Sequence, residues 1–277
     1  MAHAELGLAN GALSCAVAPG LGAKITSLVN RTTGREWLWT NPQLPRRPAE
    51  PGDSYVAQHD TGGIDECFPS VHGVLYGRPW RVEAYTAREL TLATDDPTGA
   101  WTFRRSLRID PRAPRLELSY EVRSRASAEL PFVWCLHPLF PAEPGMRIEL
   151  PHSTPIRVAA AHGAPAADLL TVPPASAPPF AAKLFAGPFR RGEVALRSAD
   201  GRETLRLRFD PGEVPFVGIW LNHGRWSGAG GPPYRNLALE PSIGDADELG
   251  DALARGTAAR LASGARRRWR IGIELEP

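Results

Sequence analysis

One short segment, Asp60 to Gly73 (DTGGIDECFPSVHG), combines several carboxylates with an imidazole. Its paired glycines allow a tight backbone turn, so Asp65 and His72 could lie in a small space. Titratable groups beside apolar residues are where shifted pKa values and functional sites concentrate, and an imidazole changes charge near neutral pH. The segment is therefore a candidate binding or catalytic site, although acidic residues after Gly-Gly also cap ordinary turns.

His137 is the second candidate, and it lies inside the apolar run Pro131 to Phe140 (PFVWCLHPLF). A strand interior is a rigid support for a catalytic group, and the adjoining Pro138 interrupts the hydrogen-bond ladder there. With an unperturbed pKa of about 6.5, an imidazole can hold or release a proton near neutral pH. The alternative is a core histidine whose hydrogen bonds are satisfied by its neighbours.

Glu240 is the third candidate, because it ends an apolar segment and is followed by Pro241 and a glycine-containing turn (NLALEPSIG). In that position the carboxylate would project from the edge of the sheet into any site there. Burial would raise its pKa and make it a stronger base. The alternative is a carboxylate satisfied by turn amides or by one of the many arginines.

The fourth candidate segment is Trp220 to Gly224 (WLNHG), with Trp226 close behind it. Aromatic faces beside amides suit the apolar faces and hydroxyl edges of sugars, but Trp220 could equally belong to the core. We therefore treat Trp220 as a candidate binding residue only in combination with the other three segments.

Several classes of site and partner are disfavoured by the sequence. It contains no Cys-x-x-Cys, His-Glu-x-x-His, phosphate-binding Gly-rich loop or Gly-x-Ser-x-Gly motif, and its cysteines and histidines have no recognised zinc spacing. The 32 basic and 30 acidic side chains are interleaved along the chain, which disfavours nucleic acid and acidic membranes as partners. We therefore expect no metal, no nucleic acid and no membrane partner.

Cysteine and lysine usage is also informative. The three cysteines, Cys15, Cys67 and Cys135, are an odd number without close pairing, which is unlike a secreted disulfide framework and favours the cytoplasm. The sequence has no run of about 18 apolar residues that could cross a bilayer. Lysine occurs only at Lys24 and Lys183, and we interpret the arginine excess as a codon bias of the source.

Alternation of apolar and polar residues predicts that strands position these side chains. The segment Arg115 to Arg123 (RLELSYEVR) alternates over its whole length, as a strand with one buried face does. The same period recurs in four other segments, which are Trp80 to Tyr85, Glu89 to Thr94, Glu203 to Phe209 and Arg268 to Leu275. The continuous apolar runs Pro131 to Phe140 and Val214 to Leu221 predict strands buried on both faces.

Helices are expected to be few. With 28 prolines among 277 residues, the chain disfavours long helices, and Asp245 to Arg255 carries the main helical pattern, with an acidic start. Gly163 to Ala182 is predicted to be a long loop, in which Ala166 to Leu170 could form a turn of helix. One large antiparallel sandwich, with residues 1–277 as a single domain, is the economical interpretation. Two β domains are the alternative.

Taken in order, these segments resemble the aldose 1-epimerase, or galactose mutarotase-like, family. The resemblance begins at Gly22 to Leu28 (GAKITSL) and Thr33 to Leu38 (TGREWL), and it continues through GGIDECFP, His72-Gly73, LHPLF and LEPS. It implies an all-β fold, a large antiparallel β supersandwich of the galactose mutarotase-like type with at most one or two short helices. It also implies interconversion of the α and β anomers of an aldose without a cofactor.

The resemblance assigns roles to individual residues. Glu240 would be the general base on the C1 hydroxyl, His137 the general acid to the ring oxygen, and His72 a residue that binds and orients the sugar. Asp65 and Trp220 would line the same cleft. Arg78 is a further candidate to hold the sugar, by its position only.

One departure from the family pattern concerns the second histidine. Galactose mutarotases usually carry asparagine and tyrosine around it, whereas this chain has Leu136, Pro138 and Phe140, which argues against galactose as the sugar. We therefore predict a cytoplasmic aldose 1-epimerase-like enzyme, a monomer or homodimer, that acts on a small-molecule sugar. The alternatives are a noncatalytic sugar-binding or regulatory protein on the same fold, and an isomerase or lyase for a modified or acidic sugar, which an extra arginine in the cleft would indicate.

Overall fold

Strands dominate the computed structural model, which describes residues 4–50, 52–164, 168–228 and 231–276. One set of strands is β1 (Leu6–Ala9), β2 (Leu13–Ala18), β3 (Lys24–Asn30), β4 (Arg35–Glu36), β5 (Gly63–Cys67), β11 (Trp134–Pro141), β13 (Ile156–His162), β14 (Phe180–Ala186), β17 (Phe216–His223) and β18 (Arg235–Ile243). A second set is β6 (Arg81–Tyr85), β7 (Glu89–Asp95), β8 (Trp101–Ile109), β9 (Arg115–Ser124), β12 (Arg147–Glu149), β15 (Glu193–Arg197), β16 (Thr204–Phe209) and β20 (Arg266–Glu276). The remaining elements are β10 (Leu130–Phe132), β19 (Ala259–Leu261), a 3-10 turn (Pro19–Leu21) and the helices α1 (Tyr55–Gln58) and α2 (Leu249–Ala254).

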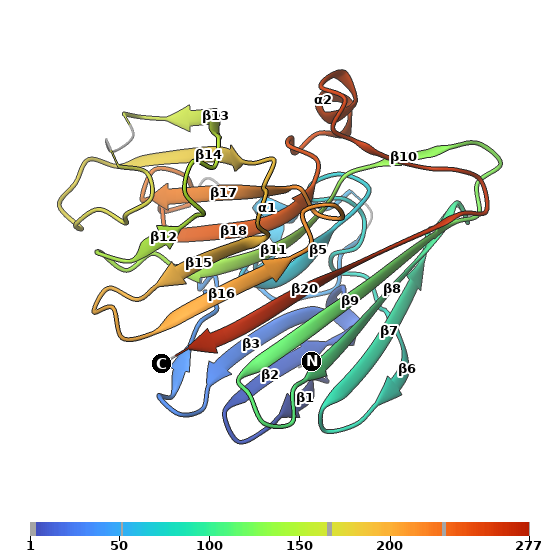
Figure 1. The fold of residues 1–277 in the computed structure, drawn as a ribbon, viewed down its shortest axis with the longest axis horizontal. Coiled ribbons are helices and arrows are strands. Elements are labelled where there is room, and N and C mark those ends of the chain that lie inside the picture. The colour runs from blue at the N-terminus through green and yellow to red at the C-terminus, as the bar shows by residue number, and fades with distance from the viewer. Residues whose placement is uncertain (1–3, 51, 165–167, 229–230, 277) are drawn as a thin grey trace.

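The strands form two large antiparallel sheets. The ten-stranded sheet has the order β1-β2-β3-β5-β11-β18-β17-β14-β13, with β4 paired to β3. The eight-stranded sheet has the order β12-β15-β16-β20-β9-β8-β7-β6, and β10 and β19 form a separate pair. In Figure 1 the strands β15, β16, β20 and β9 cross in front of the ten-stranded sheet. The predicted antiparallel sandwich is therefore confirmed.

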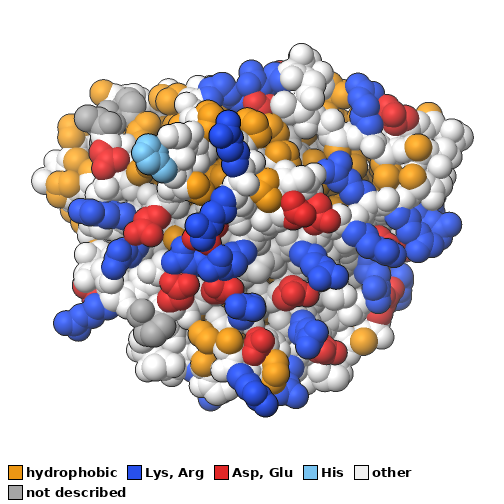
Figure 2. All heavy atoms as spheres, viewed as in Figure 1, with side chains coloured by type: hydrophobic (Ala, Val, Ile, Leu, Met, Phe, Trp, Pro, Cys, Tyr) orange, Lys and Arg blue, Asp and Glu red, His pale blue; other side chains and the backbone are white. Residues whose placement is uncertain are grey.

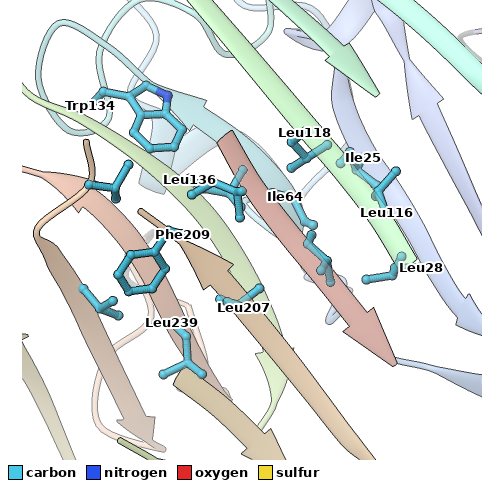
Figure 3. Packing of buried hydrophobic residues seen from close by; sticks show 14 of the residues in the cluster. Ile25, Leu28, Ile64, Leu116, Leu118, Trp134, Leu136, Leu207, Phe209 and Leu239 are labelled. Atoms are coloured by element: carbon cyan, nitrogen blue, oxygen red, sulfur yellow. The ribbon is translucent and has the colours of Figure 1, made fainter. Parts of the chain in front are cut away.

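The hydrophobic core lies between the two sheets. β8 and β9 bury alternate residues, because successive side chains of a strand point to opposite faces. β11 is buried along almost its whole length, since it lies in the middle of the ten-stranded sheet. Figure 3 shows Leu116 and Leu118 of β9 among Ile64 of β5 and Leu136 of β11, so side chains of both sheets share one cluster.

A buried polar network at Glu66 of β5 joins the two sheets. Its Oε1 accepts hydrogen bonds from Arg105 Nη1 of β8 and from the Tyr120 hydroxyl of β9, both at 2.9 Å. Its Oε2 accepts a hydrogen bond from Trp134 Nε1 at 2.8 Å. Burial raises the pKa of Glu66, although Arg105 opposes the shift. Because both carboxylate oxygens are engaged inside the core, Glu66 contributes to the packing of the sheets.

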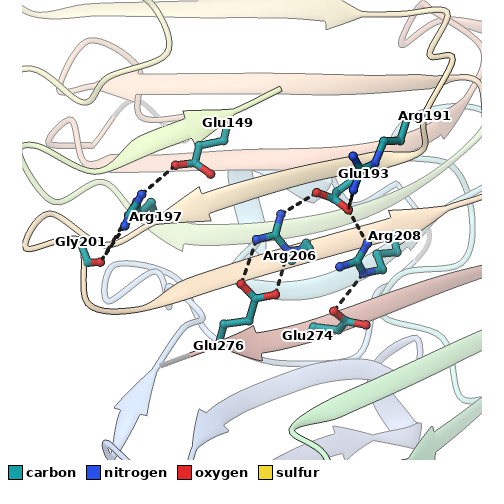
Figure 4. Close-up of polar contacts among 9 residues, drawn as sticks. All are labelled: Glu149, Arg191, Glu193, Arg197, Gly201, Arg206, Arg208, Glu274 and Glu276. Atoms are coloured by element: carbon teal, nitrogen blue, oxygen red, sulfur yellow. Dashed lines mark hydrogen bonds and ion pairs between the residues drawn. The ribbon is translucent and has the colours of Figure 1, made fainter. Parts of the chain in front are cut away.

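The outer face of the eight-stranded sheet carries cross-strand ion pairs (Figure 4). Arg206 contacts Glu193 at 2.7 Å and Glu276 at 2.9 Å, and Arg208 Nε lies 3.0 Å from Glu274 Oε2. Figure 2 shows basic and acidic side chains interspersed over this face. Partly exposed pairs of this kind contribute about 0–1 kcal/mol each, so the face is best described as a solvated, charge-balanced surface.

All five alternating segments form strands, and the two apolar runs are also confirmed in outline. The run Pro131 to Phe140 is divided at Val133, whose backbone N–H donates to Pro69 O at 2.8 Å, outside the sheet ladder. The apolar run expected from Val214 begins as a strand at Phe216. The segments Gly22 to Leu28 and Thr33 to Leu38, which carry the start of the resemblance, contribute to the antiparallel pair β3 and β4.

Two sequence-based boundaries are corrected by the structure. α2 is shorter than the helix expected over Asp245 to Arg255. The Asp245 carboxylate accepts hydrogen bonds from the side chains of Arg255 and Thr257, and this holds the residues between Asp245 and the start of α2 in a non-helical turn. The loop predicted to end at Ala182 ends at Pro179, since β14 begins at Phe180 and pairs with the distant β17.

Two short helical segments differ from the sequence-based expectation. α1 was not predicted from the sequence. The helical turn expected at Ala166 to Leu170 begins outside the described residues, and residues 168–170 are not helical. Within the described ranges, no helix has both the length and the apolar character that crossing a membrane requires.

Candidate active site

A cavity of about 240 Å³ lies on the face of the ten-stranded sheet that points away from the core. Its wall includes side chains of β11, β18, β17 and β14, which are neighbours in that sheet (Figure 1). Alternate residues of the same strands, such as Leu136 and Leu239, point into the core. The lining residues are Tyr55, Val56, Thr61, Val71, His72, His137, Leu139, Ala160, His162, Lys183, Trp220, Trp226, Tyr234, Asn236, Glu240 and Asp247.

Glu240 and Lys183 form a buried ion pair on this wall. Lys183 Nζ lies 2.5 Å from Glu240 Oε2 and 3.1 Å from Asp247 Oδ1. The two residues belong to β18 and β14, which are separated by β17. Gly218 of β17 lies opposite Glu240, and a side chain there would meet the carboxylate. The absence of a side chain at Gly218 therefore lets the ammonium and the carboxylate meet across the middle strand.

The second oxygen of Glu240 faces His137. Glu240 Oε1 lies 3.9 Å from His137 Nε2. Both Glu240 Oε1 and His137 Nδ1 are buried and have no hydrogen-bond partner among the described residues. A buried polar atom without a hydrogen-bond partner is energetically costly. Such an atom in a folded protein is often explained by a catalytic role or by a bound molecule that completes its hydrogen bonds. Glu240 and His137 therefore present polar atoms with unused hydrogen-bonding capacity at this site.

His72 is held beside these residues by aromatic contacts. Its ring stacks on Tyr55 with centroids 4.3 Å apart, and it meets the His137 ring nearly at right angles at 5.3 Å. Tyr55 lies on the short helix α1, so this helix supports the histidine pair. Trp220 and Trp226 cover another part of the wall, with ring centroids 5.5 Å apart and planes 80° apart.

Burial and the neighbouring cation set the charge of the site. Burial, together with the nearby charges of Lys183 and Lys24, lowers the pKa of His137 to about 3. Burial also lowers the pKa of His72 to about 3, with His137 and Lys183 acting in the same direction. Burial would lower the pKa of Lys183, but Glu240 and Asp247 reverse the shift and raise it. At neutral pH both imidazoles are therefore neutral, and Lys183 is an ammonium ion.

Asp65 does not line the cavity; it lies behind Tyr55. Its Oδ2 accepts a hydrogen bond from the Tyr55 hydroxyl at 2.7 Å and pairs with Lys24. Lys24 Nζ also donates to Gly62 O at 2.6 Å. Asp65 and Glu66 are adjacent on β5, and their side chains point to opposite faces of the sheet. The structure thus brings Asp65 close to the site but separates it from the cavity by one aromatic ring.

Solved structures with the same architecture were found by comparison, whereas no family model and no curated protein match the sequence. The Slr1438 protein of Synechocystis sp. PCC 6803 has a TM-score of 0.74 at 16% identity, covering 100% of this chain and 96% of that chain. A galactose mutarotase related enzyme of Lactobacillus acidophilus has a TM-score of 0.69 at 16% identity, covering 99% and 98%. A proposed aldose 1-epimerase of Escherichia coli K12 has a TM-score of 0.70 at 14% identity, covering 99% of each chain.

This chain has the galactose mutarotase-like fold. The predicted fold class is therefore confirmed, and the resemblance noted in the sequence extends to the whole described structure. At 14–16% identity the likeness concerns the fold. Because a fold does not fix function, the chemistry of this protein depends on its own side chains.

Within the galactose mutarotase-like fold, four of the five predicted site residues share one cavity. These four are His72, His137, Trp220 and Glu240. Asp65 supports Tyr55 from behind the wall. Arg78 is not among the cavity residues. In the described part of the chain, no group of three or more histidine, cysteine or acidic side chains is arranged to hold a metal ion.

Sequence reasoning missed Lys183, Asp247 and Tyr55. One signal could have indicated the first of them, because Lys24 and Lys183 are the sole lysines among 32 basic residues. Both are buried and ion-paired. Because both lysines occupy buried ion pairs, their rarity in an arginine-rich chain is the signal that could have indicated Lys183.

Proposed function

We propose that the protein is an aldose 1-epimerase-like isomerase that interconverts the α and β anomers of a neutral monosaccharide. The observation that carries the proposal is the pair formed by Glu240 Oε1 and His137 Nε2, 3.9 Å apart on the cavity wall. Opening and closing a sugar ring requires one group that removes a proton and another that supplies one. Glu240 and His137 are the pair suited to that exchange.

The proposed reaction begins when Glu240 accepts the proton of the anomeric hydroxyl. The bond between C1 and the ring oxygen breaks, its electron pair moves to the ring oxygen, and His137 donates a proton there from its ring N–H. The product is the open-chain aldehyde. After rotation about the C1–C2 bond the two groups exchange roles, and the ring closes with the other configuration. Protons and electrons balance over the cycle, so no cofactor is required.

His137 acts in this scheme as a neutral imidazole. Its pKa of about 3 keeps the imidazolium form rare at neutral pH. A neutral imidazole paired with a carboxylate base is an effective electrophile in isomerase sites, where its N–H polarises a substrate oxygen. The nearby ammonium of Lys183 offsets negative charge that develops on the imidazole during transfer.

The chemistry of the cavity favours a single uncharged sugar ring. The residues that line it include no arginine, and Lys183 is already paired with two carboxylates. An anionic sugar would therefore meet no free cation. The volume of about 240 Å³ is below the range of about 300–1,000 Å³ typical of sites for larger ligands. These features favour a neutral monosaccharide over a phosphorylated or acidic one.

The remaining predicted residues have supporting roles in this proposal. His72 and Trp220 bind the sugar through hydrogen-bonding and apolar contacts. Asp65 acts indirectly by holding the Tyr55 hydroxyl. We further propose a cytoplasmic location, since Cys15, Cys67 and Cys135 are free thiols. The proposed oligomeric state is a monomer or homodimer.

The direct test is the rate of mutarotation of freshly dissolved α-anomers of several aldoses, followed by polarimetry or NMR. We expect acceleration with at least one neutral aldose and a loss of about 10²- to 10⁴-fold in Glu240→Gln, because a proton-transfer group typically contributes that factor. Unchanged rates with every sugar, or full activity in Glu240→Gln, would refute the proposal. Saturable sugar binding without anomer exchange would instead identify a noncatalytic sugar-binding protein.

A further inference from the structure

Lys183 and Glu240 are placed together by the sheet itself. They lie on β14 and β18, with β17 between them, and Lys183 is opposite Trp220 whereas Glu240 is opposite Gly218. A Cβ atom at Gly218 would lie 2.8 Å from Glu240 Oε2. The strand that separates the pair therefore has a gap in its side chains at the place where the ammonium meets the carboxylate.

The two oxygens of Glu240 have different surroundings. Oε2 accepts a hydrogen bond from Lys183 Nζ at 2.5 Å. Oε1 is buried, lacks a hydrogen-bond partner in the described structure, and faces His137. One oxygen is thus anchored by Lys183, and the other faces His137 without a hydrogen-bond partner in the described structure.

We propose that Lys183 is a positioning residue of the proposed reaction: through Oε2 it holds Glu240 as an anion, and it leaves Oε1 as the base that faces the cavity. This inference rests on the proposed function. Asp247 Oδ1 also lies within ion-pair distance of the ammonium, at 3.1 Å. Lys183 is therefore fixed at two points, and its position defines that of the carboxylate.

The electrostatics of the surrounding groups support this role. The titratable groups that face the pair are His72, His137, Asp247, Cys67 and Cys135. At neutral pH the two imidazoles and the two thiols are uncharged, so Lys183 is the cation beside Glu240 that offsets its burial. Burial raises the pKa of Glu240 and Asp247 adds to that rise, whereas Lys183 opposes both.

The same contacts exclude a covalent role for Lys183. An amine must lose a proton before it can attack the aldehyde of the open-chain sugar. Two carboxylates beside Nζ favour the protonated form. Lys183 thus acts on Glu240 by charge and hydrogen bonding.

The test compares the pH dependence of kcat/KM in the wild type, Lys183→Met and Lys183→Arg. Lys183→Met should move the acidic limb of the profile upward by at least one pH unit. At pH values below the shifted limb, kcat/KM of Lys183→Met should then be lower than that of the wild type by about tenfold or more. At higher pH it should recover toward the wild-type value. Lys183→Arg should restore the wild-type limb at least in part. A loss in Lys183→Met that is equal at every pH would overturn the proposal, because a contact with the sugar or a structural role has that effect.

A second measurement separates this inference from the proposed function. The ¹³C signal of the Glu240 carboxyl carbon, assigned with Glu240→Gln, reports its titration even if no aldose proves to be a substrate. The midpoint should rise in Lys183→Met and stay near the wild-type value in Lys24→Met, which removes the other buried lysine and whose partner is Asp65. An unchanged midpoint in Lys183→Met refutes the role of Lys183. If Lys183→Met does not fold, Lys183→Gln takes its place in both experiments.

Discussion

Replacing Gly218 by alanine should reduce activity and leave the fold intact. The backbone of Gly218 has no left-handed φ, so alanine fits its conformation. Its new methyl group would lie 2.8 Å from Glu240 Oε2 and 3.3 Å from Glu240 Cδ, whereas ordinary contact begins at 3.4 Å. The carboxylate must therefore move by several tenths of an ångström, away from the anchor that Lys183 provides.

The size of the effect follows from the precision that proton transfer needs. A misplacement approaching 1 Å can cost about 10²-fold in rate, which corresponds to about 2.7 kcal/mol in the activation free energy. Stability should change by less than about 1 kcal/mol, because alanine restricts the unfolded chain and so offsets part of the local strain. We therefore expect a large loss of kcat with little change in the denaturant midpoint.

The assay is mutarotation of the best aldose substrate, with urea unfolding measured on the same samples. Gly272→Ala is the matched control, because Gly272 also lies within a strand, β20, and its new methyl group would be 3.7 Å from the nearest neighbouring atom. This control should keep both activity and stability. Wild-type activity in Gly218→Ala would refute the idea that Gly218 makes room for the Lys183–Glu240 pair.

Two further predictions concern stability. Arg105→Met should lower the free energy of unfolding in urea by about 3–5 kcal/mol, because it leaves the fully buried Glu66 carboxylate without its cation. Adding Glu66→Gln should recover part of that loss, and an unchanged unfolding free energy in Arg105→Met would contradict the assigned role of the network. The unfolding free energy should also decrease as the pH falls from about 6.5 toward 3, since the unfolded chain protonates His137 in this range while its folded-state pKa is about 3. His137 should contribute up to about 1.4 kcal/mol per pH unit to the slope of unfolding free energy against pH, and His137→Asn should remove that contribution. Equal slopes in the wild type and in His137→Asn would show that His137 is not buried in its neutral form.

Much of the fold was predictable from local sequence. Side chains of a strand alternate between two faces, so segments such as Arg115 to Arg123 show their structure through periodicity alone. His137 and Glu240 could be identified because a polar residue inside an apolar strand is unusual at any position in a fold. The sequence also indicated that helices would be few, and α2 lies where the acidic start was found.

The rest depended on which strands become neighbours. The local sequence does not distinguish Asp65 from Glu66. Asp65 lies on the sheet face that carries the cavity and Glu66 on the face that packs against the second sheet, so their roles depend on how the two sheets pack. Lys183 lies 57 residues from Glu240 in the chain and reaches it across β17.

The sequence by itself therefore determined the strand content and the two groups suited to acid–base chemistry, since both follow from residue type and local pattern. The tertiary structure decided which cation sets the charge of Glu240 and which carboxylate lies behind Tyr55. These are contacts between distant segments, and pairing in a sheet depends on the register of whole strands.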